Sequence, residues 1–328
     1  MHVRGTVLVT GAGGFIGHHL VKYLVDKGYW VRGADIKYPE YENSAAHEFR
    51  VCDLRRAEAC QDVTHGMNYV YHLAANMGGI GFITAKKAEV VRDNTLMDIQ
   101  MLDAALEHDV RRFLFTSSAC VYPLRLQHEA AARPLRESDA YPADAEDGYG
   151  WAKLHTERAC RHYREEFGLQ TRVVRLHNIF GPLGAYDGGR EKSPAALCRK
   201  IALADEGGEL EIWGDGEQTR SYCYVSDCVE GLCRLTRSTH VHPVNLGQTR
   251  LVTINQLADM IETISGKHLS RRYDSSRPQG VRGRSSDNTN LRRVLGWEPE
   301  VSLEAGLAAT YTWIAGELER RPASLTRI

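Results

Sequence analysis

A chain of 328 residues, 43% of them hydrophobic, can bury a large core and suits two lobes better than one small domain. Its formal net charge of -1 excludes the strongly basic surface with which proteins attract nucleic acid or an anionic membrane. We therefore expect any bound anion to be held by a few local cations.

The spacing of the cysteines and the length of the apolar runs indicate the cellular compartment of the protein. No apolar run approaches the roughly 18 residues of a membrane helix, and the N-terminal residues lack the pattern of a signal peptide. The eight cysteines have neither a CxxC pair nor the regular spacing of a small secreted protein. We expect a reduced, cytoplasmic protein without a membrane segment or a metal site.

Short β-rich runs alternate with longer stretches of helical spacing in the first half of the chain. The predicted strands are residues 6–10, 30–34, 49–51, 69–73, 113–117 and 171–176. This alternation predicts an α/β fold with a Rossmann-type doubly wound parallel sheet, covered by helices on both faces. A strand near residues 243–247 is expected to return to the sheet.

The first predicted strand runs directly into a glycine-rich loop that precedes a helical stretch. Gly11 allows a tight turn, Gly14 lets the backbone approach a pyrophosphate, and Gly17 lets the helix pack closely on the strand. The helix N-terminus then offers free N–H groups to phosphates. We expect a dinucleotide to contact Gly11, Gly14, Phe15, Ile16 and Gly17.

Two aspartates follow the next predicted strands. Asp35 lies 24 residues after Gly11, where its carboxylate can accept hydrogen bonds from an adenosine ribose diol and repel a 2′-phosphate. This favours NAD over NADP, although the nearby Arg32 and Lys37 leave NADP open. Asp53 follows the third strand and is expected to bind the adenine amino group.

Tyr149 and Lys153 are four residues apart, so a helix would place them on one face. A phenol with a pKa of about 10 is a poor base at neutral pH, and an adjacent ammonium favours the phenolate. A strand ends upstream at Ser117 and Ser118, where a hydroxyl can bind the same substrate oxygen. Cys120 follows two residues later, so an extended strand would point its thiol into the same pocket.

The glycine loop, the strand-end serine and the Tyr149–Lys153 pair, in this order, resemble the extended short-chain dehydrogenase/reductase family. The resemblance makes Ser118, rather than Ser117, the serine of the triad. It narrows to the GDP-mannose 3,5-epimerase group of that family through residues 74–82, 117–120, 177–182, 188–192, 213–220 and 281–288. Two positions depart from the group's pattern, Asn76 in place of an aspartate and Trp151 in place of an aliphatic residue.

This resemblance implies epimerisation of a GDP-sugar, most of all GDP-mannose to GDP-L-galactose or GDP-L-gulose. Tyr149, Lys153 and Ser118 would serve transient oxidation at C4 by NAD. Cys120 and Lys192 would exchange protons at C5 and C3. The implied substrate-binding residues are Gly78, Ser118, Cys120, Asn178, Glu191, Lys192, Lys200, Gln218, Arg220 and Arg282. The cations among them suit a pyrophosphate, which guanidinium groups bind in a bidentate manner.

The resemblance also implies the organisation of the chain. Residues 1–177, with about 229–249, would form the NAD-binding Rossmann domain. About 178–228 and 250–328 would form a smaller α/β lobe that binds the sugar nucleotide. A homodimer packed through helices near 94–108 and 149–167 is expected.

Three other functions stay open at this stage. A C4-epimerase of another nucleotide sugar would need the triad but would incorporate no solvent deuterium. A net NAD(P)-dependent reductase or dehydrogenase of a nucleotide sugar would turn over free nicotinamide. A non-enzymatic relative that senses NAD or binds RNA usually lacks the Tyr149–Lys153 pair, which is intact here.

Overall fold

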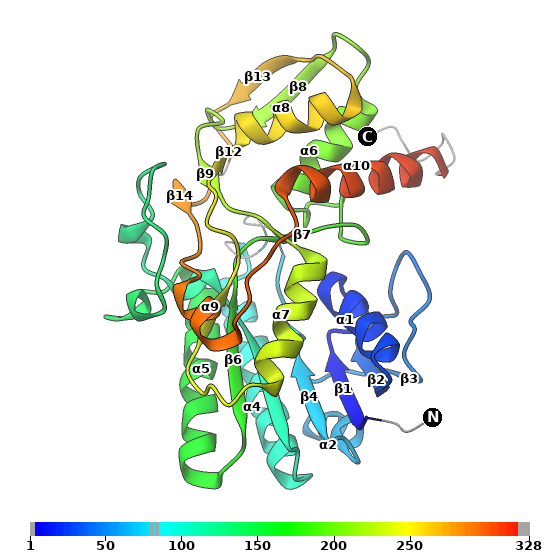
Figure 1. Ribbon diagram of the computed structural model, residues 1–328, viewed down its shortest axis with the longest axis vertical. Helices are drawn as coiled ribbons and strands as arrows, with labels where there is room; N and C mark the ends of the chain where they lie inside the picture. The colour runs from blue at the N-terminus through cyan, green and yellow to red at the C-terminus, as the bar shows by residue number, and fades with distance from the viewer. Residues whose placement is uncertain (1–3, 79–81, 83–84, 278, 321–328) are drawn as a thin grey trace.

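The structure of the protein is a computed structural model that describes residues 4–78, 82, 85–277 and 279–320. Residues 79–81 of the segment 74–82, which supports the family resemblance, lie outside the described residues. Figure 1 shows a parallel sheet with its helices in the lower part of the view and a smaller lobe above it.

The central sheet has seven strands, and every neighbouring pair is parallel. In spatial order they are β11 (Val244–Leu246), β6 (Thr171–Leu176), β5 (Arg112–Ser118), β4 (Tyr69–His72), β1 (Thr6–Thr10), β2 (Trp30–Asp35) and β3 (Glu48–Val51). Successive side chains of β1 enter opposite cores, with Val7 and Val9 on one face and Leu8 on the other. A strand buried on both faces explains the continuous apolar run.

Helices cover both faces of this sheet, as Figure 1 shows. On one face α1 (Phe15–Asp26) packs against α7 (Val225–Arg237). On the other lie α2 (Ala57–Thr64), α4 (Lys87–Glu107) and α5 (Asp147–Phe167). The predicted doubly wound α/β fold is therefore confirmed. Each predicted strand agrees with the structure to within one residue at either end, including the returning strand β11.

The smaller lobe has its own core, formed where α6 (Ser193–Leu203), α8 (Ile254–Ser265) and α10 (Leu303–Arg320) meet. Its strands pair as β8 (Glu209–Trp213) with β13 (Ser270–Asp274), and as β12 (Val252–Thr253), β9 (Thr219–Arg220) and β14 (Gly283–Arg284). β7 (Ile179–Phe180) pairs with β10 (Cys223–Tyr224), and α9 (Thr289–Leu295) packs near β11. The exact bounds of the two predicted domains stay a prediction.

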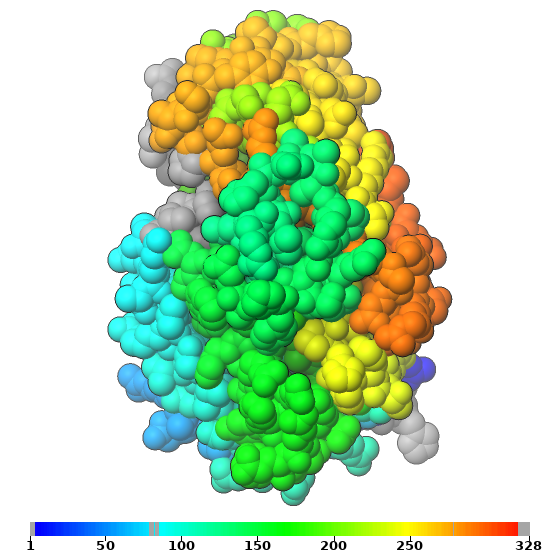
Figure 2. All heavy atoms as spheres, turned by 90° about the vertical axis from the view of Figure 1, so that its left-hand side faces the viewer, coloured from blue at the N-terminus to red at the C-terminus, as the bar shows by residue number. Residues whose placement is uncertain are grey.

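Residues 119–145 form a long excursion between β5 and α5. It contains three short 3-10 helices, η1 (Ala119–Val121), η2 (Leu124–Leu126) and η3 (Glu137–Ala140). Figure 2 shows this segment, in blue-green, across the face where the two lobes meet. Its backbone is tied to the region of β14, since Leu135 N donates to Ser285 O at 3.0 Å and Arg282 N to Gln127 O at 2.9 Å.

Helix α5 approaches the start of this excursion closely at Gly150. A Cβ atom on Gly150 would lie 2.2 Å from the carbonyl oxygen of Cys120, a distance that no side chain tolerates. The backbone N–H of Glu146 also donates to that carbonyl oxygen at 2.8 Å. The helix that carries Tyr149 is thus in direct backbone contact with the turn that carries Cys120.

No helix among the described residues is long and apolar enough to cross a membrane. All eight cysteines lie in the described part of the chain and are free.

Candidate active site

A cavity of about 630 Å³ lies at the carboxyl ends of the parallel strands and extends to α6 and α10 of the smaller lobe. Open α/β sheets bind ligands at this edge. The predicted site residues on its wall are Gly11, Gly14, Phe15, Ile16, Gly17, Asp35, Asp53, Gly78, Ser118, Tyr149, Lys153, Asn178 and Lys192. Tertiary structure therefore brings together residues from most of the length of the chain.

The glycine loop forms a tight cradle at one end of the cavity. Gly11 has a φ of +70°, a left-handed conformation that favours glycine. A Cβ atom on Gly17 would lie 2.0 Å from Gly11 O, and one on Gly13 would lie 2.2 Å from Lys37 O. Helix α1 begins at Phe15 without a side-chain cap. Its first N–H groups are thus available to a phosphate, and the loop fits the diphosphate of NAD.

Asp35 lies beside this cradle, where its Oδ2 accepts a hydrogen bond from Gly13 N at 2.9 Å. Burial raises the pKa of this carboxyl above its usual value. Arg32 turns away, because its Nε donates to Glu48 Oε2 at 2.7 Å. Lys37 remains on the cavity wall, but the carboxylate nearest to the loop favours a ribose diol. Asp53 pairs with Arg55 at 2.8 Å, and its contact with adenine stays a prediction.

The Ser118, Tyr149 and Lys153 side chains meet where β5 ends beside α5. Ser118 hydrogen-bonds the Tyr149 phenol, and the Lys153 ammonium lies 5.9 Å from the Tyr149 ring centre. Ser117 instead donates to Glu157 Oε1 at 2.6 Å. The geometry thus agrees with the choice of Ser118 over Ser117.

In the structure, the net shift of the Tyr149 pKa runs against the phenolate. Lys153 was expected to favour the phenolate of Tyr149. Burial instead raises the pKa of Tyr149 well above its usual value, and the neighbouring Cys120 and Asp98 act in the same direction. A hydrogen bond from Ser118 opposes them without outweighing them. Desolvation wins because Tyr149 is 7% exposed.

A buried polar network that sequence reasoning missed lies behind Lys153. Asp98 Oδ2 is 3.8 Å from Lys153 Nζ, and its Oδ1 is 2.9 Å from His72 Nε2. Burial favours the neutral acid, yet Lys153 and His72 hold the pKa of Asp98 below its usual value. Burial lowers the pKa of Lys153. An aspartate on the same helix face as the apolar Met97, Met101 and Ala105 was the available signal.

The predicted extended backbone at Cys120 is also wrong. Strand β5 ends at Ser118, and Cys120 lies in the 3-10 turn η1. Ser118 Oγ accepts a hydrogen bond from Cys120 N at 3.2 Å and so caps this turn. Cys120 is half-buried and packs against Tyr149 all the same. The hydrogen bond that Cys120 N donates to Ser118 Oγ sets the position of Cys120. The alternation of side chains along a strand does not.

Lys192 reaches the same region from the other lobe, as the residue immediately before α6. It lines the cavity. The surrounding protein desolvates its ammonium and lowers its pKa, whereas Cys120 acts to raise it. Cys120 and Lys192 therefore lie within electrostatic reach of each other, beside the triad.

Comparisons with known proteins agree with this geometry. Residues 7–247 match the model of the NAD dependent epimerase/dehydratase family. The chain belongs to this family. Two similar curated proteins are GDP-mannose 3,5-epimerase 1 of Oryza sativa subsp. japonica, 44% identical over 96% of this chain and 82% of that protein, and GDP-mannose 3,5-epimerase of Arabidopsis thaliana, 43% identical over 97% and 84%.

A similar solved structure is the UDP-glucose 4-epimerase from Thermotoga maritima with UDP-glucose. It has a TM-score of 0.87 and 29% identity, and the match covers 95% of this chain and 99% of that one. The protein is thus an NAD-dependent enzyme of the epimerase/dehydratase family with the fold of the nucleotide-sugar epimerases.

Six residues predicted to bind the sugar nucleotide do not line this cavity, and most of them already have protein partners: Cys120, Glu191, Lys200, Gln218, Arg220 and Arg282. Lys200 Nζ is 3.1 Å from Glu211 Oε2, and Arg282 Nη1 is 2.7 Å from Asp215 Oδ1. Burial lowers the pKa of Arg220 to about 10. Within the described chain, Gln218 Oε1 and Glu191 Oε2 are buried without a hydrogen-bond partner. Such acceptors are free for a ligand.

Four predicted substrate-binding residues line the cavity: Gly78, Ser118, Asn178 and Lys192. Asn178 has a φ of +44° and donates from Nδ2 to Ser221 O at 2.9 Å. Glu146 and Arg284, next to Cys120, were not predicted. The available signal for Arg284 was its place in segment 281–288, which carries the family resemblance; Glu146 lies in none of the segments that do.

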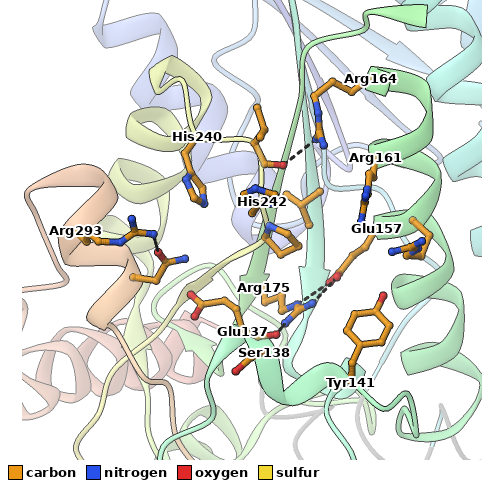
Figure 3. A pocket seen from close by; sticks show the side chains of 15 residues that line it. Glu137, Ser138, Tyr141, Glu157, Arg161, Arg164, Arg175, His240, His242 and Arg293 are labelled. Atoms are coloured by element: carbon orange, nitrogen blue, oxygen red, sulfur yellow. Dashed lines mark hydrogen bonds and ion pairs between the residues drawn. The ribbon is translucent and has the colours of Figure 1, made fainter. Parts of the chain in front are cut away.

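Figure 3 shows a second cavity, of about 320 Å³, at the edge of the sheet beside α5. Its arginines are partly engaged, since Arg175 binds Glu157 through two hydrogen bonds of 2.6 and 2.8 Å and Arg164 donates to Val241 O at 2.8 Å. None of the predicted site residues lines it. The larger cavity is therefore the candidate active site. Among the described residues, no group of three or more His, Cys, Asp or Glu could hold a metal ion.

Proposed function

We propose that the protein epimerises a GDP-sugar, converting GDP-mannose to GDP-L-galactose, GDP-L-gulose or both. One observation carries the proposal. The Ser118–Tyr149–Lys153 triad lines the cavity together with Lys192, and Cys120 packs against Tyr149 beside them. A redox triad alone would serve many reactions, but an added thiol and amine suit proton exchange at carbon. The two GDP-mannose 3,5-epimerases at 43–44% identity support the substrate.

The triad acts first, at C4 of the sugar. In its phenolate form, Tyr149 takes the proton of the C4 hydroxyl, and Ser118 donates a hydrogen bond to the same oxygen. The reaction therefore requires Tyr149 to lose its own proton first, against the burial that raises its pKa. Lys153, whose ammonium lies 3.8 Å from Asp98 Oδ2, would hold the nicotinamide ribose. When bound, NAD would supply a two-electron acceptor for C4 that is reoxidised within the same turnover, so net redox change would be zero.

Cys120 and Lys192 act next. A ketone at C4 acidifies the hydrogens on C5 and C3, because the carbanion that forms is stabilised as an enolate. One of the two side chains removes a proton from one face of the ring while the other returns a proton to the opposite face. Exchange of the two roles between C5 and C3 restores both side chains.

We infer that the remaining predicted residues bind the cofactor and the nucleotide. Gly11, Gly14, Phe15, Ile16, Gly17, Asp35 and Asp53 would hold NAD. Gly78, Asn178, Glu191, Lys200, Gln218, Arg220 and Arg282 would hold the GDP-sugar. The unpartnered oxygens of Glu191 and Gln218 support this assignment. Binding would require Lys200 and Arg282 to exchange their present carboxylate partners for the pyrophosphate.

We also infer a cytoplasmic homodimer. Helices α4 and α5 pack against each other, and they carry exposed apolar side chains, Leu96 at 42% and Trp151 at 48% exposure. Burial of this face against a second copy would remove apolar surface from water. Sedimentation of the purified protein tests the dimer.

The decisive test is incubation of the purified protein with GDP-mannose in D₂O without added NAD, followed by NMR of the sugar. We expect deuterium at C5, and at C3 if both centres invert, together with signals of GDP-galactose or GDP-gulose. A C4-epimerase, which the similarity to UDP-glucose 4-epimerase favours, would give a new sugar without deuterium. Stoichiometric NADH release, or an unchanged sugar after NAD is supplied, would contradict the proposal.

A further inference from the structure

Arg284 is a buried cation beside Cys120, and its position is fixed from three sides. It is 7% exposed and lies in β14. Its Nε donates to Gln127 Oε1, its Nη2 to Glu146 Oε2 at 2.6 Å, and its Nη1 approaches Cys120 Sγ at 3.8 Å. Because a guanidinium is planar and rigid, the first two contacts determine where Nη1 points.

Glu146 completes the surroundings of the thiol. Its backbone N–H donates to the Cys120 carbonyl oxygen, and the Cys120 thiol hydrogen-bonds its carboxylate. The Glu146 residue is 9% exposed. Cys120 is thus held between a buried cation and a buried anion, whose effects water screens weakly.

The two charges oppose each other at the sulfur. Burial raises the pKa of the Cys120 thiol, Glu146 raises it further, and Arg284 lowers it. Burial alone would neutralise Glu146, but Arg284 holds the pKa of its carboxyl below the usual value. Both members of the pair are therefore charged. The charged and titratable groups that face Cys120 are Glu146, Tyr149, Lys192, Arg220 and Arg284.

We propose that Arg284 and Glu146 are positioning residues that set the charge of Cys120 in opposite directions, the guanidinium favouring the thiolate and the carboxylate favouring the thiol. This inference rests on the proposed role of Cys120 in proton exchange. A thiolate removes a proton as the C–H bond breaks and an S–H bond forms, and the electron pair stays on the keto-sugar. Return of a proton to carbon needs the thiol. Because Cys120 must both remove and return protons, it benefits from a neighbouring cation that favours the thiolate and a neighbouring anion that favours the thiol.

The test is the pH dependence of Cys120 alkylation by iodoacetamide in the substrate-free protein with its NAD. The thiolate is the reactive form, so the midpoint of the profile reports the pKa of Cys120. Arg284→Met should move the midpoint up by about 1–3 pH units, and Glu146→Gln should move it down by a similar amount. Arg284→Lys, which keeps the charge, should recover part of the shift.

Two controls accompany this measurement. Cys120→Ser gives the background from the other seven cysteines. Arg250→Met removes an exposed arginine that pairs with Glu304, and it should leave the profile unchanged. If Arg284→Met fails to fold, Arg284→Gln, which removes the charge but keeps hydrogen-bonding groups, tests the upward shift, and Glu146→Gln tests the downward one.

Deuterium exchange separates this inference from the proposed function. At neutral pH, exchange at C5 should fall about tenfold or more in Arg284→Met and recover at higher pH, while oxidation of C4, followed at 340 nm, stays within about twofold. Midpoints that do not move, or that move in the same direction, would overturn the inference. Opposite shifts without any change in exchange would uphold it and overturn the role of Cys120 in the reaction.

Discussion

The two ends of the candidate active site are built in different ways. The proposed redox end comes from one strand and one helix, with Ser118 at the end of β5 and Tyr149 and Lys153 one turn apart on α5. The proposed proton-exchange end is assembled from four separate segments, which contribute Cys120, Glu146, Lys192 and Arg284. Local geometry fixes the first end, whereas the second depends on how the lobes and the excursion 119–145 pack.

The two ends also differ in the charges that surround their reactive groups. At the redox end, Lys153 and Asp98 form one buried pair with a supporting histidine. At the exchange end, charges of both signs surround a single thiol. The first arrangement keeps Asp98 in its charged form. The second places opposed charges beside the Cys120 sulfur, which can then exist as a thiol or a thiolate. Substitutions at the two ends should therefore fail in different ways.

The largest expected effect is that of Tyr149→Phe. Loss of the phenolic proton acceptor should lower kcat by about 10²–10⁴-fold. It should also abolish deuterium exchange, because no ketone forms to acidify C5. NMR turnover assays with GDP-mannose measure both. Tyr163→Phe on the same helix, whose hydroxyl binds Asp103 away from the site, is the matched control. Deuterium entry without C4 oxidation would show that the two ends are independent.

Cys120→Ala should separate the two ends cleanly. We expect deuterium incorporation at C5 to fall about 10²-fold or more, since one of the two proton-transfer groups is gone. Oxidation of C4 should persist, with absorbance at 340 nm from the retained cofactor. Full epimerisation by this variant would remove Cys120 from the mechanism.

Asp98→Asn tests the support of the redox end. An unpaired Lys153 ammonium in the buried network should cost about 3–5 kcal/mol of stability in urea unfolding. The native pKa of Asp98 is depressed, so its stabilisation is present above the unfolded pKa of about 4 and is lost as the pH falls below it. The difference from the wild type should therefore shrink in acid. Asp103→Asn, at the surface, should cost about 1 kcal/mol or less; an equal loss there would point to helix α4 as a whole.

The smallest effect is expected for Arg282→Met, at the rim. Loss of a partly exposed cation worth about 1 kcal/mol should raise KM for GDP-mannose about fivefold and leave kcat unchanged. Arg250→Met, which breaks a comparable surface pair, should change neither. A fall in kcat with constant KM would move Arg282 from binding to catalysis.

Sequence reasoning succeeded where the information is local. The glycine cradle, the strand ends and the pairing of Tyr149 with Lys153 follow from spacing within one β-α unit or one helical turn. The predicted extended conformation of Cys120 was wrong, because no feature of the strand-like run 113–120 predicts that Ser118 caps a turn. Sequence reasoning also missed Arg284, which stands 164 residues from Cys120, and Asp98, which sits among apolar helix positions. Both depend on packing that no spacing rule contains.

The close approach at Gly150 joins these two ends mechanically. Since α5 lies directly on the Cys120 carbonyl, a shift of the helix would carry the turn with it, and the phenol and the thiol should keep a constant separation. A sugar oxidised at C4 would then meet its proton-transfer groups without waiting for a rearrangement. For an enzyme whose intermediate is a reactive ketone, the missing side chain of one glycine would thus shorten the time in which that ketone could escape.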